Sequence, residues 1–162
     1  MTEVKENSLI VELRTIAELI GEEGIQAEFY RQMLKDAKPI EVVRLSEVFS
    51  PAEVKAIEVL VYPKKKQCYR NATLLSHIFP DVKYVEGKMT CCGAFGIEHA
   101  WNKVGDKYVD ITMELVLDRD PTKEEYMALG EYDQETVVSI CSEVGFYGSV
   151  YPILYNKQKS EK

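Results

Sequence analysis

The segment from His99 to Asp110 constrains the fold of this chain more than any other stretch of the sequence. At its centre, Val104-Gly105-Asp106-Lys107 is a turn signal between two β-prone runs, and a two-residue Gly-Asp turn predicts a hairpin of fixed register. In that register residue 103 lies opposite 108, and His99 and Asp110 point to the same face because side chains alternate along a strand. The two side chains are then diagonal neighbours, roughly 5 to 8 Å apart between Cβ atoms, which permits an imidazole-to-carboxylate hydrogen bond. A three-residue loop would place them on opposite faces.

A histidine held by a carboxylate usually orients a base for a third group, and Cys68 is the best candidate for that group. Cys68 lies at the predicted start of a helix over 68–79. The helix is indicated by an apolar stripe at three- and four-residue spacing, formed by Ala72, Leu75 and Phe79. The positive end of the helix dipole and a nearby imidazolium would both favour the thiolate. The sequence therefore predicts that Cys68, His99 and Asp110 act together.

Four short motifs follow one another in this region of the chain. They are Cys68-x-x-x-Ala72, Lys83-Tyr84-Val85-Glu86-Gly87, His99-Ala100-Trp101-Asn102 and Tyr108-Val109-Asp110-Ile111-Thr112. Together with the order Cys, His, Asp, they resemble the core of the transglutaminase-like superfamily of papain-like cysteine enzymes. The resemblance covers about residues 60–117. It departs from the family pattern at Lys83, where an Arg is common, and at Ile111, where a Pro is common.

The resemblance implies an α+β fold, in which the helix that bears Cys68 packs on an antiparallel sheet and is preceded by N-terminal helices. It also implies a cysteine-type hydrolase or acyltransferase, with Cys68 as nucleophile, His99 as base and acid, and Asp110 as the group that orients the imidazole. Water as acceptor would give a peptidase, amidase or deamidase, and an amine would give a transglutaminase-like transfer. The substrate would be a protein, a peptide or an amide-containing small molecule.

Two further residues are candidates for oxyanion or substrate binding. Gln67 directly precedes the cysteine, and its side chain could join the backbone N–H of Cys68 in an oxyanion hole. Trp101, the one tryptophan, shares the predicted face of His99, and we expect it to shield the site from water.

A non-catalytic interaction domain on the same fold is the alternative hypothesis. In that case the N-terminal helices would bind a partner protein. Against it stands the intact Cys–His–Asp set, which a scaffold has no physical need to keep.

A zinc site formed by Cys68, Cys91, Cys92 and His99 is a weaker hypothesis. Adjacent cysteines in an extended segment point to opposite faces, and the sequence contains no CxxC or HExxH. We therefore expect neither a metal nor another cofactor. Cys141 lies in an apolar helical pattern and is interpreted as a buried thiol, and His77 is interpreted as structural.

Length and charge limit the class of protein. A chain of 162 residues fits one domain with a core that needs no disulfides, and a net charge of -7 disfavours nucleic acid as a partner. The acidic start has no apolar segment typical of a signal peptide, and no apolar run approaches the ~18 residues of a membrane span. We expect a cytoplasmic protein with four reduced thiols and no membrane partner.

Within this single domain (1–162) the patterns predict a mainly helical N-terminal part (1–60), the Cys/His/Asp core (61–117), C-terminal helices with a strand (118–155), and a disordered tail (156–162). The predicted helices are 8–20 with a Ser8 cap, 22–37, one starting at Pro51 after a Ser50 cap, 68–79, 122–129 and 133–144; the predicted strands are 83–87 and 149–155.

Overall fold

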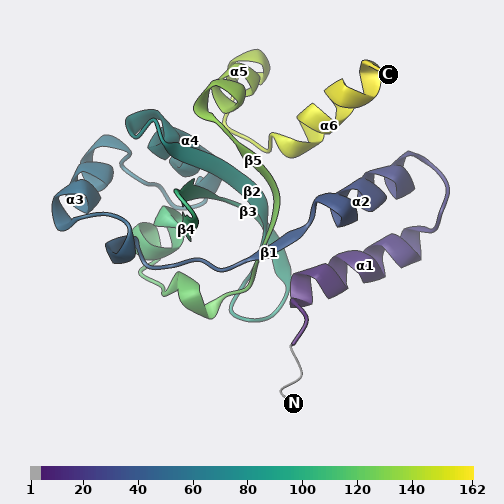
Figure 1. The fold of residues 1–162 in the computed structure, drawn as a ribbon, viewed down its shortest axis with the longest axis horizontal. Helices are drawn as coiled ribbons and strands as arrows, with labels where there is room; N and C mark the ends of the chain where they lie inside the picture. The colour runs from purple at the N-terminus through teal and green to yellow at the C-terminus, as the bar shows by residue number, and fades with distance from the viewer. Residues whose placement is uncertain (1–4) are drawn as a thin grey trace.

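A curled antiparallel sheet forms the centre of the computed structural model, which describes residues 5–162 (Figure 1). Its strands are β1 (Lys38–Ile40), β2 (Val82–Thr90), β3 (Gly96–Val104), β4 (Lys107–Val109) and β5 (Tyr126–Tyr132). They lie in the order β1-β5-β2-β3-β4, and each neighbouring pair is antiparallel.

The two edges of the sheet approach each other just after β1. Val42 forms a parallel bridge with Tyr108 of β4, and the backbone N–H of Val43 donates to the Tyr108 carbonyl at 2.8 Å. The chain therefore joins one edge of the sheet to the other. Buried apolar side chains from the strands and from the segments next to them pack together in the resulting core, namely Val42, Val85, Met89, Trp101, Tyr108, Met113, Tyr126 and Ala128.

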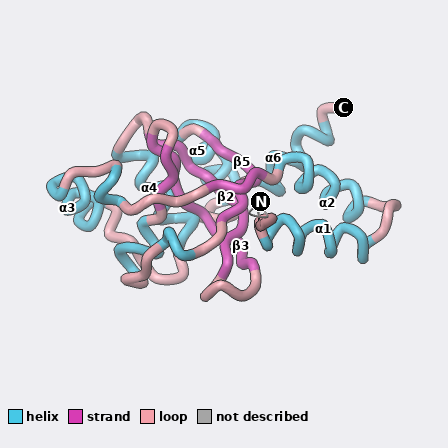
Figure 2. Tube along the Cα trace, turned by 60° about the horizontal axis from the view of Figure 1, so that its bottom comes forward, coloured by secondary structure: helices cyan, strands magenta, loops and turns pink. Residues whose placement is uncertain are grey.

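Helices surround the sheet on several sides. They are α1 (Ser8–Ile20), α2 (Ile25–Asp36), α3 (Pro51–Leu60), α4 (Cys68–Ile78), α5 (Gln134–Val144) and α6 (Tyr151–Ser160). The α1–α2 hairpin extends from one end of the molecule and α3 lies at the other end, with the sheet between them (Figure 2). Within residues 5–162, no helix has the length and apolar character needed to cross a membrane.

The helix that bears Cys68 packs directly on the sheet. Ala72 of α4 lies in one buried cluster with Tyr84 of β2 and Ala100 of β3. Asn102 of β3 adds hydrogen bonds to this contact, because its side-chain amide donates to the carbonyls of Ala72 at 2.8 Å and Lys83 at 3.2 Å. The predicted α+β class is therefore confirmed, as is the packing of a cysteine-bearing helix on an antiparallel sheet that follows N-terminal helices.

Several local predictions are also confirmed. The hairpin has the expected register, with Lys103 opposite Tyr108, and Gly105 supplies the positive φ of 62° in its turn. Ser50 forms the predicted capping box, because its hydroxyl accepts from the N–H of Glu53 while the Glu53 carboxylate accepts from the N–H of Ser50. The cap of α1, however, is Asn7 and not Ser8; the Ser8 N–H and hydroxyl instead bond the Glu125 carboxylate.

The helix predicted at 122–129 is wrong. Only Pro121–Lys123 forms a short helical turn, and Tyr126–Tyr132 is strand β5, in the interior of the sheet between β1 and β2. Met127, Ala128 and Leu129 favour a helix intrinsically, but Tyr126, Met127 and Ala128 are buried by pairing on both sides. Tertiary burial overrides weak local propensity here.

The strand predicted at 149–155 and the disordered tail at 156–162 are also wrong, because helix α6 runs from Tyr151 to Ser160. Its first turn contains a proline, which suits a helix start. The decisive contact comes from the buried Glu86 of β2, whose carboxylate accepts from the backbone N–H groups of Val150 at 2.8 Å and Tyr151 at 2.6 Å. A carboxylate at this end also complements the helix dipole.

Candidate active site

Cys68 is presented by a loop that a buried asparagine holds in place. Asn71, one turn into α4, accepts from the N–H of Lys64 at 3.0 Å and donates to its carbonyl at 2.9 Å. The same amide nitrogen donates to the hydroxyl of Thr112 at 3.0 Å, which joins the loop to the segment after β4. Asn71 therefore fixes the loop that leads into Cys68. Sequence reasoning missed this role, although a polar residue on the buried side of a predicted helix is a signal for it.

His99 of β3 and Asp110, which directly follows the last residue of β4, meet as predicted. The Nε2 atom of His99 lies 2.7 Å from Oδ2 of Asp110, and both side chains are buried, with 5% of the histidine and none of the aspartate exposed. Because Nε2 is occupied by the carboxylate, Nδ1 is the ring nitrogen left for a further partner. The geometry thus orients the imidazole.

Asp110 is itself held by two further donors. The hydroxyl of Tyr126 donates to Oδ2 at 2.8 Å, and the backbone N–H of Met113 donates to Oδ1 at 3.1 Å. Burial, and then the charge of Asp110, raise the pKa of the Tyr126 hydroxyl, so it stays protonated and donates. Tyr126 was missed because its segment was predicted as a helix.

The pKa of His99 reflects these partners. Burial of the ring lowers it, but the charge of Asp110 and the hydrogen bond to it outweigh burial, and an interaction with the Cys68 side chain adds a smaller increase, so that the pKa rises to about 10. The imidazolium is therefore the dominant form of His99 at neutral pH. His99 is thus paired with Asp110, and Cys68 lies close enough to affect the pKa of the ring.

Cys68 and His99 open into one cavity of about 340 Å³. Thr112 and Met113, from the segment that follows Asp110, form part of its wall. The cysteine is half-buried at the start of α4, where the first N–H groups of a helix have no acceptor within the helix. The cavity therefore holds a thiol, an imidazolium and backbone donors in one place.

Gln67 and Trp101 lie outside the wall of this cavity, as far as the described residues define it. Gln67 is the exposed N-cap residue of α4. Trp101 is only 1% exposed and lies behind His99, with its ring stacked at a centroid distance of 6.2 Å, and its other side meets Tyr126 edge-on at 5.1 Å. Trp101 therefore supports the imidazole from the core.

The remaining cysteines differ from Cys68. Cys91 and Cys92 also line this cavity; burial and the neighbouring Cys92 raise the pKa of the Cys91 thiol. Arg119 donates to the sulfur of Cys92 at 3.1 Å. Among residues 5–162 no group of three or more His, Cys, Asp or Glu side chains is placed to hold a metal ion.

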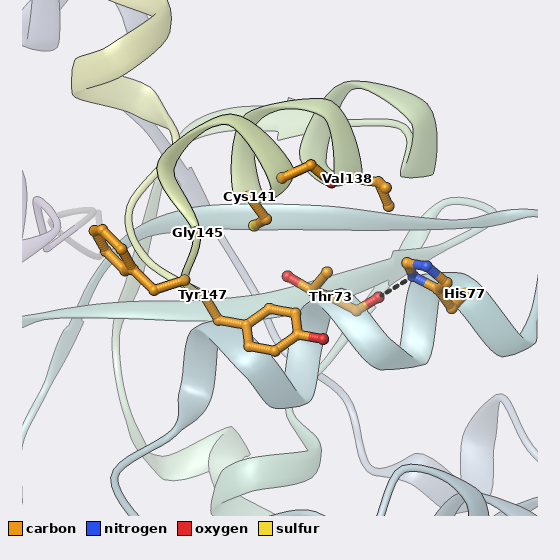
Figure 3. Close-up of a pocket in the computed structure, with 8 residues that line it drawn as sticks. Thr73, His77, Val138, Cys141, Gly145 and Tyr147 are labelled. Carbon is orange, nitrogen blue, oxygen red and sulfur yellow. Dashed lines mark hydrogen bonds between the residues drawn. The ribbon is translucent and has the colours of Figure 1, made fainter.

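A second cavity, of about 360 Å³, lies between α4 and α5 and also contains a cysteine and a histidine (Figure 3). Here His77 Nδ1 is 3.3 Å from the carbonyl oxygen of Thr73, and burial raises the pKa of Cys141. No carboxylate is found among the described residues that line it. This cavity therefore lacks the group that orients an imidazole.

Comparisons of the chain with protein-family models, with curated proteins and with solved structures return no match.

Proposed function

We propose that the chain is a cysteine-dependent acyl-transfer enzyme, built on a distant version of the papain-like core of the transglutaminase-like superfamily. One observation carries the proposal: His99, fixed by a 2.7 Å bond to the buried Asp110, lines the same cavity as Cys68, which lies at the N-terminus of α4. The order of the three residues along the chain and the packing of α4 on an antiparallel sheet are in keeping with that core.

In the first half of the reaction, Cys68 Sγ attacks the acyl carbon as a thiolate, with its proton held by His99. The carbonyl π electrons move to oxygen, and the resulting oxyanion can be met by the backbone N–H of Cys68 at the helix N-terminus. When the bond to the leaving group breaks, His99 donates its proton to the departing amine or alcohol. The product is a thioester on Cys68.

In the second half, His99 is neutral and takes a proton from the acceptor. Water or an amine then attacks the thioester carbon, and the Cys68 sulfur leaves as a thiolate. Water gives hydrolysis, whereas an amine gives a new amide. Asp110 keeps the ring in one orientation through both halves and stabilises its cationic form.

Burial of the pair supports catalysis over a purely structural role. Removing a carboxylate and an imidazolium from water carries a desolvation penalty of several kcal/mol per ion, which their mutual attraction repays only with excellent geometry. Well-packed apolar residues of similar volume are often as stable or more so. Stability alone therefore gives no reason for Asp110 and His99 at these positions.

A non-catalytic interaction domain is the second candidate function. The observation that favours it is at the tip of the α1–α2 hairpin, where Leu19 and Ile25 are 82% and 76% exposed. Exposed apolar side chains on a projecting hairpin are typical of protein contacts. On this hypothesis Cys68 would be dispensable and the hairpin tip would not.

Trapping of the acyl-enzyme tests the proposal. The protein is mixed with p-nitrophenyl acetate, quenched in acid, and analysed by intact mass and peptide mapping. We expect a burst of nitrophenol and a single acetyl group on Cys68, with no burst from Cys68→Ala. Cys141→Ala, which removes a thiol from the second cavity, is the matched control and should keep the burst.

Acetylation spread over all four cysteines, or a burst that survives in Cys68→Ala, would contradict the enzyme proposal. Full biological activity of Cys68→Ala, lost instead in a Leu19→Lys variant, would favour the interaction domain.

A further inference from the structure

The mouth of the Cys68 cavity carries more positive than negative charge, in a protein that is acidic overall. Lys65 and Lys66 line it from the loop before α4, and Arg119 lines it from the segment that follows the turn at Asp118. One carboxylate, that of Glu98, lies among the same lining residues. Against a net charge of -7 for the chain, this is a local reversal of sign.

The charge of these three cations is not offset by an ion pair within the described residues. Within residues 5–162, none of the ion pairs involves Lys65, Lys66 or Arg119. Lys103, by contrast, meets the carboxylate of Glu131 at 3.1 Å. Cations without a carboxylate partner keep their full attraction for an incoming anion.

Their positions are set by backbone contacts. The double hydrogen bond between Asn71 and the backbone of Lys64 anchors the loop that carries the two lysines. The N–H of Arg119 donates to the carbonyl of Met113 at 2.9 Å, which anchors the opposite segment. The charged rim is therefore attached to the same residues that position the candidate triad.

The rest of the wall is largely apolar. Met89, Ile97, Met113 and Leu117 contribute side chains to the cavity. A volume of about 340 Å³ is in the range of small-molecule sites and exceeds what a single acetyl group needs. An apolar interior below a cationic rim favours a molecule that has both an apolar part and a negative charge.

We propose that the cavity takes an acyl compound that has an apolar body and a carboxylate, and that Lys65, Lys66 and Arg119 bind the carboxylate at the rim. This inference rests on the proposed function, because it assumes that Cys68 is the reacting group. It narrows the substrate from any acyl compound to an anionic, partly apolar one.

Alkylation of Cys68 by a charged and a neutral reagent tests the inference without any turnover. Iodoacetate and iodoacetamide form the same carbon–sulfur bond and both release iodide, but only iodoacetate is an anion. The ratio of their rate constants at Cys68 is measured by peptide mass spectrometry and divided by the ratio for the same peptide in urea. That division removes the intrinsic difference between the two reagents.

We expect the folded protein to favour iodoacetate about tenfold at low salt, because a cleft of one sign raises the local concentration of the opposite charge. Each charge removed by Lys65→Gln, Lys66→Gln or Arg119→Gln should lower the ratio about twofold, as for a unit charge roughly 8 Å away in water. Lys107→Gln and Lys123→Gln remove exposed lysines that do not line the cavity and should leave the ratio unchanged.

The outcomes separate the two proposals. If Cys68 reacts quickly with iodoacetamide but shows no preference for iodoacetate, the substrate class is wrong and the proposed enzyme stands. If Cys68 reacts no faster than Cys141 with either reagent, the proposed function itself fails.

Protection of Cys68 by small ligands tests the roles of the carboxylate and of the apolar wall separately. Octanoate should slow the reaction of Cys68 with iodoacetamide more than octanamide or inorganic phosphate does. Equal protection by octanoate and octanamide would refute the role of the carboxylate, and equal protection by phosphate would refute the role of the apolar wall.

Discussion

Replacing Asp110 by asparagine isolates the role of the charge that orients His99. The amide has the shape of the carboxylate, but only one of its two ends accepts hydrogen bonds. In the protein, Oδ2 accepts from His99 and Tyr126, and Oδ1 accepts from the N–H of Met113. In either orientation the amide NH2 group of the variant faces at least one donor.

The cost follows from that count. A buried donor left without an acceptor costs about 1–3 kcal/mol. In a domain of this size each kcal/mol lowers Tm by about 2–4 °C, so we expect a fall of about 2–12 °C. The variant also loses the attraction that outweighs burial at His99, so the pKa of the imidazole should fall from about 10 to its ordinary range or below. Activity should fall by up to about 10⁴-fold, as in related triads.

NMR of ring-labelled histidine measures the central quantity. The chain has two histidines, and His77→Gln assigns their signals. In the wild type, the His99 ring should remain an imidazolium until the pH approaches about 10, and in Asp110→Asn it should lose its proton at a much lower pH. Asp106→Asn, in the exposed turn of the same hairpin, is the control and should change neither titration nor Tm. Equal titration of His99 in wild type and Asp110→Asn would refute the reasoning.

Three further predictions concern stability. Glu86→Gln should lower the free energy of unfolding in urea by about 3 kcal/mol, because the NH2 end of the amide would face N–H groups or hydroxyls that now donate to the carboxylate. Glu41→Gln, at an exposed position, is the control and should change this free energy little. Gly87→Ala should lower the free energy of unfolding by about 3 kcal/mol, because a Cβ there would lie 1.9 Å from a carbonyl oxygen of β5. A fully stable variant would contradict the pairing of β2 with β5. The pKa of His99 is raised in the folded state, so the stability that this residue contributes should be complete below about pH 6.5 and decline as the pH rises to about 10. Urea unfolding curves of His99→Gln should lack this decline.

The parts of the site that were predictable depend on local rules. A two-residue turn sets the register of its own hairpin, so the approach of His99 to Asp110 followed from the spacing alone. The capping box at Ser50 and the start of α4 at Cys68 are equally local. Such features need no knowledge of the rest of the chain.

The missed parts depend on contacts between distant residues. The segment from Tyr126 is a strand because β1 and β2 pair with it on either side. In this strand the Tyr126 hydroxyl donates to Asp110. The segment from Tyr151 became a helix because Glu86, far away in the sequence, bonds its first N–H groups. No periodicity within either segment encodes its distant partner, so a single sequence could not reveal these outcomes.

The charge around the cavity shows the same limit. Three consecutive lysines at 64–66 in an acidic protein are typical of a solvated loop, and their proximity to Cys68 is the one functional role that the sequence suggests for them. Only the fold places Arg119 at the same cavity, from a segment that follows Asp110 in the sequence. A local excess of positive charge in an acidic chain therefore becomes visible only in three dimensions.

The most direct test of the central claim is competitive alkylation of the four thiols with a small amount of iodoacetamide at about pH 6, where an ordinary thiol is almost entirely protonated. Peptide mass spectrometry then gives the share of label on each cysteine. We expect Cys68 to take most of the label and to lose this advantage in His99→Ala, while Cys141 stays nearly unlabelled. A result in which the folded protein labels Cys68 no faster than Cys141, or in which His99→Ala leaves the rate at Cys68 unchanged, would contradict it.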